Sequence, residues 1–371
     1  MIKIAFVINT IYSPTGGTEK QLLLLLKNLD RSRFSPILCV VHSSDWLEKE
    51  FDLCPLYNMN IRSYRSFGTL GRFWEFVRFI KRQKIDIIHT LFKDGMRIGI
   101  PAGKLAGIRS IIAVRRSQGY WMTSFDLKIT KLINRWVDLI IANSNDTRRW
   151  TAEVEGFPQD KIEVIHNGID LQPFIALSAD TRAQYRVKLG IPSDVPVVGI
   201  VANLRPVKSI DTFIRAARLV HDALPATRFV LVGDGDQEES LRLMAKDLDL
   251  NDNMYFLGRR TDIVPILTTF DVGVLTSISE SFSNSIVEYL AAGLPVVCTE
   301  VGGAREAVEE GVNGFVVPVK NHEQLANMLI KILGGGRMKT MGEASYRKAC
   351  DQFSSQSMFR KYEDVYSAIG N

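Results

Sequence analysis

Short aliphatic runs that recur along the whole chain constrain its fold more than any other feature. In the first half they lie at Ile2–Asn9, Pro36–Val41, Ile85–Thr90, Ile111–Val114 and Asp138–Asn143. In the second half they lie at Val195–Ala202, Arg228–Gly233, Met254–Gly258, Asp271–Thr276 and Pro295–Thr299. Longer helix-like stretches separate the runs, as in parallel sheets with crossover helices, and the runs are hydrophobic enough to be covered on both faces. We predict an α/β protein with two doubly wound parallel-sheet domains.

The length of 371 residues fits two domains, at roughly 100–200 residues each. We predict an N-terminal domain over residues 1–175, a C-terminal domain over residues 190–350, and a helix over residues 351–371 that crosses back to the N-terminal domain. Turn formers between Asp170 and Val195 indicate the connection. Because open parallel sheets bind ligands at the carboxyl ends of their strands, we expect the two domains to face each other across one cleft.

Charge is distributed unevenly along the chain. The first 170 residues carry 25 Lys and Arg against 17 Asp and Glu, although the net charge of the whole chain is only +5. A basic first half fits a phosphate-bearing substrate or an anionic membrane surface. The basic residues are dispersed, and the sequence has no zinc-finger spacing and no extended basic arm, so we exclude nucleic acid as the partner.

Other sequence features indicate where the protein works. No apolar run approaches the ~18 residues that a membrane-spanning helix needs, and Met1–Asn9 is too short before its polar break for a secretory signal. The four cysteines lack the spacing of metal ligands, which excludes zinc and favours reduced thiols over disulfides. We expect a cytoplasmic protein.

One acidic, hydroxyl-rich segment follows a second-half strand. Ser283, Asn284 and Ser285 are candidates for the N-cap of a helix whose free N–H groups and dipole would attract a phosphate. Glu280 precedes that helix and Glu288 lies about one turn inside it, so both carboxylates could accept hydrogen bonds from sugar hydroxyls. Taken alone, the two acids are as readily explained as a solvated loop residue and a helix-start residue.

Two cations follow the predicted strand Val195–Ala202. Arg205 can bind two phosphate oxygens through its planar guanidinium, and Lys208 acts as a point charge. Both would lie at the carboxyl end of the strand, where a diphosphate binds. The alternative is that they are surface charges at the start of a helix.

A glycine pair, Gly16 and Gly17, separates the first strand from a leucine-rich helix. Glycines let the backbone approach a phosphate closely, although a mobile turn explains the pair equally well. The dinucleotide pattern G-x-G-x-x-G is absent, which argues against nicotinamide and flavin cofactors. His89, near the end of the strand Ile85–Thr90, either faces the cleft or is a satisfied strand-end histidine.

In their order and spacing, these segments resemble the retaining glycosyltransferases of family 4, which have two Rossmann-like domains in the GT-B fold. The segments that carry the resemblance are Gly16–Glu19, Asp86–His89, Val164–Asp170, Arg205–Lys208, Leu231–Gly235, Phe256–Arg259, the E-x7-E pair Glu280 and Glu288, Ala292–Val296 and Val301–Glu306. The resemblance covers nearly the whole chain. It implies transfer of a hexosyl group from a nucleotide-diphosphate sugar, with retained configuration and no metal or other cofactor.

The resemblance also implies roles for single residues. Glu280 would hold the hydroxyls of the donor sugar, while Lys208 and Arg205 would hold the diphosphate; these three are the predicted catalytic residues. The predicted donor-binding residues are Gly16, Gly17, Asn203, Arg259, Ser283, Asn284, Ser285 and Glu288, the last of them on the ribose hydroxyls.

Two positions depart from the family pattern. Asn203 stands where the family usually has arginine, so Arg205 is displaced by two residues. Many members also have a cleft histidine after the strand equivalent to Ile111–Val114, where this chain has arginines. Arg116 is a candidate to contact the sugar or the acceptor there, beside His89.

A basic segment over residues 62–84 carries seven Lys and Arg and one acid. The apolar residues at helical spacing, predicted to pack on the sheet, are Leu70, Phe73, Trp74, Val77 and Ile80. Phe76 and Phe79 fall outside this stripe, where they could rest on an anionic membrane if the acceptor is a lipid-linked saccharide. A solvated basic helix face is the alternative.

The predicted function is therefore a metal-independent glycosyltransferase that uses a nucleotide sugar and a saccharide or lipid-linked saccharide acceptor, in the cytoplasm or on the inner face of the membrane. Two alternatives stay open at this point. A nucleotide-sugar epimerase or hydrolase would need a positioned general acid or base and no acceptor. A non-catalytic nucleotide-sugar sensor would be expected to have lost Glu280, Glu288 or Lys208, all of which are present.

Overall fold

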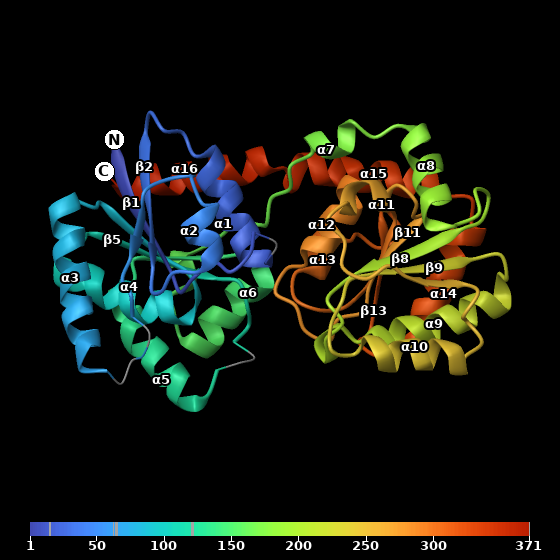
Figure 1. The fold of residues 1–371 in the computed structure, drawn as a ribbon, viewed down its shortest axis with the longest axis horizontal. Coiled ribbons are helices and arrows are strands. Elements are labelled where there is room, and N and C mark those ends of the chain that lie inside the picture. The colour runs from blue at the N-terminus through green and yellow to red at the C-terminus, as the bar shows by residue number, and fades with distance from the viewer. Residues whose placement is uncertain (15, 62, 64–65, 120–121, 371) are drawn as a thin grey trace. The chain divides into compact units, whose positions relative to one another are not determined.

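The chain divides into two compact units, Met1–His166 with Gln356–Asn371, and Asn167–Ser355. The computed structural model describes residues 1–14, 16–61, 63, 66–119 and 122–370. Each unit is a parallel sheet with helices on both faces (Figure 1). The predicted α/β class with two doubly wound parallel sheets is confirmed.

The first unit is built on a sheet with the strand order β3-β2-β1-β4-β5-β6-β7. Its strands are β1 (Ile2–Ile8), β2 (Phe34–Val40), β3 (Leu56–Asn58), β4 (Ile87–Thr90), β5 (Ser110–Arg115), β6 (Leu139–Ala142) and β7 (Ile162–Val164). Its helices are α1 (Gly17–Asn28), α2 (Asp45–Lys49), α3 (Phe67–Gln83), α4 (Phe92–Ala106), α5 (Ser124–Ile133), α6 (Asn145–Trp150) and α16 (Ser355–Gly370), with short 3₁₀ turns at Asn134–Trp136 and Gln159–Lys161 and a π turn at Thr151–Glu155. The chain reverses its direction of travel across the sheet between β1 and β4.

Both faces of this sheet are apolar, which is why its strands read as continuous hydrophobic runs. One face packs on α3 and α4, through residues such as Phe76 and Ile98. The other packs on α1 and α16, through residues such as Leu26 and Tyr362. Helix α16 is thus part of the core of the first unit, although it is the last helix in the chain (Figure 1).

The second unit has the strand order β10-β9-β8-β11-β12-β13. Its strands are β8 (Val197–Val201), β9 (Arg228–Val232), β10 (Met254–Phe256), β11 (Val272–Leu275), β12 (Val296–Thr299) and β13 (Gly314–Val317). Its helices are α7 (Gln172–Ile175), α8 (Ala179–Leu189), α9 (Ile210–Ala223), α10 (Glu238–Asp247), α11 (Ile263–Leu267), α12 (Asn284–Ala291), α13 (Ala304–Ala307), α14 (His322–Gly334) and α15 (Met338–Gln352), with a 3₁₀ turn at Pro206–Lys208. Here the direction reverses between β8 and β11, which pair directly through Val272 and Val198.

The second unit begins at Asn167, so the predicted interdomain connection between Asp170 and Val195 is part of this unit. Phe174 of α7 lies in the core of this unit, and Tyr185 and Leu189 of α8 pack against it. Residues 167–175, which the prediction placed in the N-terminal domain, therefore contribute to the second core.

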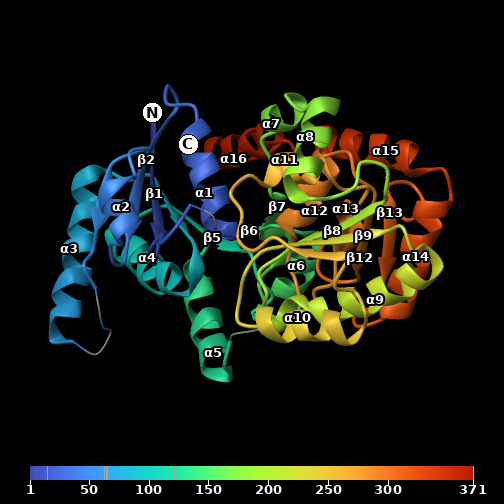
Figure 2. The ribbon, with the colours of Figure 1, turned by 45° about the vertical axis from the view of Figure 1, so that its right-hand side comes forward.

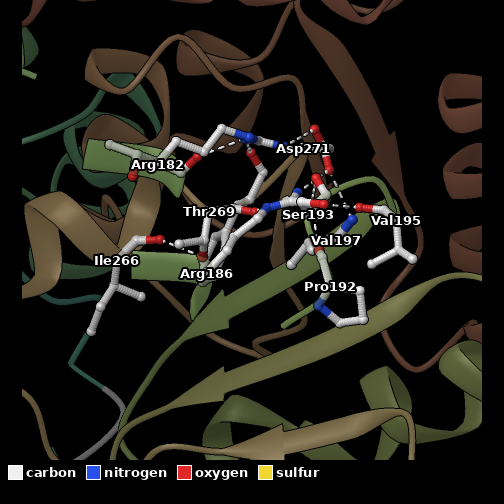
Figure 3. Close-up of polar contacts among 11 residues, drawn as sticks. Arg182, Arg186, Pro192, Ser193, Val195, Val197, Ile266, Thr269 and Asp271 are labelled. Carbon is white, nitrogen blue, oxygen red and sulfur yellow. Dashed lines mark hydrogen bonds and ion pairs between the residues drawn. The ribbon is translucent and has the colours of Figure 1, made fainter. Parts of the chain in front are cut away.

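An arginine of α8 fastens the amino-terminal ends of the two central strands (Figure 3). Arg186 is 2% exposed and binds Asp271 Oδ2 at 3.1 Å, just before β11. The same carboxylate oxygen accepts the N–H of Val197, the first residue of β8, at 2.8 Å. The carbonyls that accept hydrogen bonds from Arg186 are those of Pro192, Ser193, Val195 and Thr269. This network fixes β8 and β11 at the end of the sheet opposite to their carboxyl edge.

Helix α3, which lies on the outer side of the first unit in Figure 2, packs with a different face from the one predicted. Phe76 is fully buried, and Phe79 stacks on Tyr57 of β3 with ring centroids 3.9 Å apart. Leu70 and Trp74, predicted to pack on the sheet, are 66% and 44% exposed. The apolar pattern was compatible with two overlapping stripes, and the aromatic side chain supplied by β3 selects the one that is buried. The basic residues 62 and 65 lie outside the described residues.

Candidate active site

The two loops with the predicted catalytic residues lie at the carboxyl edge of the second sheet. Lys208 follows β8 and Glu280 follows β11, and these strands are neighbours at the point where the strand order reverses. The loops after such strands diverge to opposite sides of a sheet and leave a crevice where ligands bind in open α/β folds. Topology therefore brings together residues that are far apart in the sequence.

A lysine and a glutamate form a direct ion pair at this edge. Lys208 Nζ donates to Glu280 Oε1 at 2.5 Å, and the side chains are 24% and 17% exposed. The Ser277 hydroxyl donates to the same oxygen at 2.8 Å. The cation and the carboxylate predicted to hold a diphosphate and a sugar thus contact each other directly.

Backbone contacts hold the two loops together. The N–H of Ile278 donates to the carbonyl of Val207 at 2.9 Å, and the buried hydroxyl of Thr276 donates to the carbonyl of Lys208 at 2.8 Å. Ser209, directly after the lysine, has φ of +45°, an uncommon conformation for a residue with a Cβ. Such backbone strain is tolerated where the surroundings fix the chain, often at functional sites.

Helix α12 begins beside this pair, as predicted from its hydroxyl-rich start. Ser283 is the N-cap residue, but its side chain does not cap the helix by a hydrogen bond. Asn284 accepts a hydrogen bond from Asn167 at 2.7 Å, and Ser285 donates to the carbonyl of Val201, the last residue of β8, at 2.8 Å. Glu288 lies one turn into the helix and is half-buried. The start of α12 is therefore anchored to β8 and to the residue that opens the second unit.

A glycine lets the backbone close around the glutamate loop. Gly302 has φ of +50°, and a Cβ there would lie 2.4 Å from the carbonyl oxygens of Glu280 and Ser281. The next N–H, that of Gly303, donates to the carbonyl of Ser281 at 2.9 Å. Only glycine allows this close approach of the two backbone segments, so Gly302 helps to fix the loop that carries Glu280.

The remaining predicted residues of the second unit lie on its surface. Asn203 and Arg205 are exposed in the loop after β8, and Arg259 is exposed in the loop after β10. The carbonyl of Arg205 accepts the N–H of Lys208 at 2.9 Å, so the arginine starts the turn that positions the lysine. Their side chains are accessible to a ligand, whereas their contacts with one stay a prediction.

In the first unit, the glycine pair lies at the start of α1. Gly16 is the N-cap residue and Gly17 the first helical residue, and the carbonyl of Gly16 accepts the N–H of Lys20 at 2.7 Å. Residue 15, in the same segment, lies outside the described residues. The helix follows β1, which borders the point where the strand order of this sheet reverses. That the pair approaches a phosphate stays a prediction.

His89 does not face a cleft, because it is 1% exposed in the core of the first unit. Its Nδ1 atom is 2.9 Å from the hydroxyl of Tyr366 in α16, and its ring lies 4.9 Å from that of Phe6. Burial, followed by the charge of Arg116, lowers the pKa of His89 to about 3. The satisfied strand-end histidine is the correct alternative, and the prediction that His89 contacts an acceptor is wrong for this conformation.

Arg116 follows the last residue of β5 and is half-buried. It donates to the Tyr362 hydroxyl of α16 at 3.3 Å. Its neighbour Arg115 is buried and forms a bidentate ion pair with Glu155, both contacts being 2.8 Å long. Of the two arginines that replace the family's histidine, Arg115 is structural, and a role for Arg116 toward a sugar stays a prediction.

Sequence reasoning missed the hydroxyl residues that support the pair. Thr276, Ser277 and Thr299 are all fully buried, and the Thr299 hydroxyl donates to the carbonyl of Ser277 at 2.6 Å. Ser277 lies three residues before the glutamate, but serines are common in loops and nothing local marks this one. Within the described ranges, no group of three or more His, Cys, Asp and Glu residues is arranged to hold a metal ion.

Two family models match consecutive parts of the chain. The model described as Glycosyltransferase Family 4 matches residues 15–173, and the model described as Glycosyl transferases group 1 matches residues 181–348. A curated relative, the UDP-Gal:alpha-D-GlcNAc-diphosphoundecaprenol alpha-1,3-galactosyltransferase of Escherichia coli, is 28% identical and covers 78% of this chain and 77% of its own. Another, the N-acetyl-alpha-D-glucosaminyl L-malate synthase of Bacillus anthracis, is 25% identical and covers 77% of this chain and 75% of its own.

Solved structures agree with this assignment. Anabaena Alr3699/HepE in complex with UDP is 25% identical, with a TM-score of 0.87 over 99% of this chain and 100% of that one. The same protein in complex with UDP-glucose is similar with a TM-score of 0.84, at 25% identity and the same coverage. The matched models, the relatives and the two parallel sheets lead to one conclusion: the chain belongs to the family 4 glycosyltransferases of the GT-B fold.

Proposed function

We propose that this glycosyltransferase moves a hexosyl group from a uridine-diphosphate sugar to a hydroxyl of a lipid-linked saccharide, with retained anomeric configuration and without a metal ion. The observation that carries the proposal is the pairing of Lys208 with Glu280 at the reversal point of the second sheet, beside the start of α12. It offers a cation and helix N–H groups for a diphosphate, and a carboxylate for sugar hydroxyls. The uridine base and the lipid-linked acceptor are supported by the donors and the acceptor that the names of the similar proteins give.

The chemistry assigned to these residues is stabilisation of the leaving group. In a retaining transfer by front-face return, the incoming hydroxyl and the departing diphosphate lie on one side of an oxocarbenium-like sugar, and the departing phosphate takes the acceptor proton. Negative charge grows on the phosphate as the glycosidic bond breaks. Lys208, at the carboxyl edge of the second sheet, can stabilise that charge, and preorganised groups of this kind are worth about 3–4 kcal/mol each.

Metal independence follows from the same assignment, because Lys208 and the N-terminus of α12 supply the positive charge that a divalent ion supplies elsewhere. We expect excess EDTA to leave turnover unchanged. Restoration of lost turnover by added magnesium or manganese would contradict this part of the proposal.

A panel of nucleotide sugars tests the donor. We expect a UDP-sugar to raise the thermal midpoint more than its GDP and ADP counterparts, with the shift set by the ligand concentration over its dissociation constant. NMR of the product of transfer to a lipid-linked N-acetylhexosamine then reads the configuration of the new bond. An inverted linkage would refute retention, and interconversion of the nucleotide sugar without an acceptor would indicate the epimerase instead.

We further propose that helix α3 contacts an anionic membrane, through a face different from the one predicted. The exposed residues Leu70, Trp74, Arg78 and Lys81 follow one another at helical spacing, so they form a single exposed stripe. Two apolar side chains followed by cations suit the boundary between acyl chains and acidic headgroups. None of the helices in the described ranges is both long and apolar enough to cross a membrane.

Flotation with vesicles tests the membrane contact. We expect salt-sensitive binding to vesicles that contain phosphatidylglycerol, and none to phosphatidylcholine alone. Leu70→Glu should weaken binding severalfold, whereas the matched control Leu243→Glu, at a leucine 55% exposed on α10, should not. If both variants bind the vesicles as strongly as the wild type, α3 is not the membrane-binding element.

A further inference from the structure

Glu280 is held by only one of its two oxygens. The Ser277 hydroxyl at 2.8 Å and the Lys208 ammonium at 2.5 Å both donate to Oε1. No hydrogen bond or ion pair from the described residues reaches Oε2. Oε1 therefore accepts hydrogen bonds from the protein, whereas Oε2 can accept hydrogen bonds from a ligand.

Ser277 is itself held firmly. It is fully buried two residues after β11, and its carbonyl accepts the Thr299 hydroxyl at 2.6 Å. Thr276, the residue before it, binds the backbone of Lys208 at 2.8 Å. Two consecutive residues thus fix both members of the ion pair, one through the carboxylate and the other through the backbone that bears the lysine.

The two donors to Oε1 differ in whether a bound substrate competes for them. Lys208 has a flexible side chain, and a bound diphosphate competes with Glu280 for its charge. Ser277 is buried and has no such competitor. When the lysine turns toward the diphosphate, Ser277 is the donor that remains on Oε1 and keeps the carboxylate from rotating.

We propose that Ser277 is a positioning residue, which holds Oε1 of Glu280 so that Oε2 receives a hydroxyl of the donor sugar. The inference rests on the proposed transfer from a nucleotide sugar and deepens it. A carboxylate fixed before the substrate binds loses no rotational freedom in the transition state, and contacts realised there raise kcat more than they lower KM. The effect of Ser277 must therefore pass through the charge of Glu280.

Kinetics of Ser277→Ala with UDP-glucose and UDP-galactose as donors test this role, with UDP release as the readout. We expect kcat to fall about 10- to 100-fold, the range for loss of one hydrogen bond to a charged group, and the donor KM to change less than about threefold. Ser345→Ala is the control, because Ser345 is also a fully buried serine of the second unit and donates only to the carbonyl of Asn313, at 3.4 Å. Ser277→Cys, which keeps the volume and a weak donor, should lie between alanine and the wild type.

A double-mutant cycle separates positioning from a general structural role. In a Glu280→Gln background, Ser277→Ala should cost less than about threefold in kcat, because the charged group through which it acts is gone. A Ser277→Ala variant with kcat within about twofold of wild type, or with the same loss in both backgrounds, overturns the inference and leaves the transferase function standing. A wild-type protein that releases no UDP from either donor overturns the proposed donor and the inference together.

Discussion

Glu280→Gln removes the negative charge that holds Lys208 and keeps the shape of the side chain. The two charged groups lie 2.5 Å apart and are about one-fifth exposed. A hydrogen bond between charged groups contributes about 1.5–3 kcal/mol net. A diphosphate that takes the lysine must give up part of this interaction, so binding of the nucleotide and pairing with Glu280 compete.

Two opposite effects follow for the variant. Turnover should fall about 100-fold or more, because a contact to the donor sugar worth about 3 kcal/mol in the transition state is lost. UDP should bind about 3- to 10-fold more tightly, since the lysine is no longer paired and about 1 kcal/mol of the competition is relieved. Lys208→Ala should lower turnover to a similar extent but weaken UDP binding.

Isothermal titration with UDP and steady-state release of UDP from the donor measure the two effects separately. The matched control is Glu343→Gln, which removes the same charge from an exposed position on α15 and should change neither quantity. Near-normal turnover of Glu280→Gln would refute the role of the carboxylate. UDP binding weakened as much as in Lys208→Ala would refute the competition, because it would mean that the lysine needs Glu280 in order to bind phosphate.

Three further changes should give measurable results. Arg186→Met should lower the free energy of unfolding by about 2–4 kcal/mol in urea denaturation, because four carbonyls lose a charged donor and Asp271 is left with Arg182 as its cationic partner; a loss under 1 kcal/mol would contradict the importance of the network. Burial lowers the pKa of His89 to about 3. Below pH 6.5 the histidine is therefore protonated in the unfolded chain but stays neutral in the folded protein. The free energy of unfolding should therefore drop by about 2 kcal/mol when the pH is lowered from 7 to 5. If the free energy of unfolding of His89→Gln depends on pH as strongly as that of the wild type, other groups cause the drop. Gly302→Ala should lower kcat about 10-fold by displacing the loop of Glu280, whereas Gly311→Ala, at a similar positive φ but in open space, should have no such effect.

Local patterns were enough to predict most of the architecture. The longer aliphatic runs of the sequence are the strands at the centre of both sheets, since a strand covered on both faces needs apolar residues throughout. The edge strands β3, β7 and β13 were missed because runs of three or four residues carry little pattern, although the equally short edge strand β10 was predicted from the run Met254–Gly258. The choice between the two stripes of α3 was also out of reach, because it depends on Tyr57, which belongs to one of these short strands.

The candidate site was predictable in part. The glutamate, the lysine and the hydroxyl-rich helix start were found from residue type and spacing, and the resemblance gave them roles. The sequence left open whether His89 faces the cleft or is a satisfied strand-end histidine, because its orientation depends on Tyr366 of α16, a helix from the other end of the chain. The contribution of Ser277 was not predictable, since only the folded loop turns its hydroxyl onto Oε1 of Glu280.

The sequence by itself determined most of the segments that become strands and helices, because hydrophobic periodicity and capping act over neighbouring residues. It also gave the prediction that a lysine, a glutamate and a hydroxyl-rich helix start in its second half bind a phosphate and a sugar. The tertiary structure alone decided that Lys208 meets Glu280, because β8 and β11 become neighbours only when the crossover helices between them have packed on the sheet. The burial of apolar surface between the sheet and the helices on both of its faces stabilises this long-range pairing of strands. No local sequence pattern encodes it.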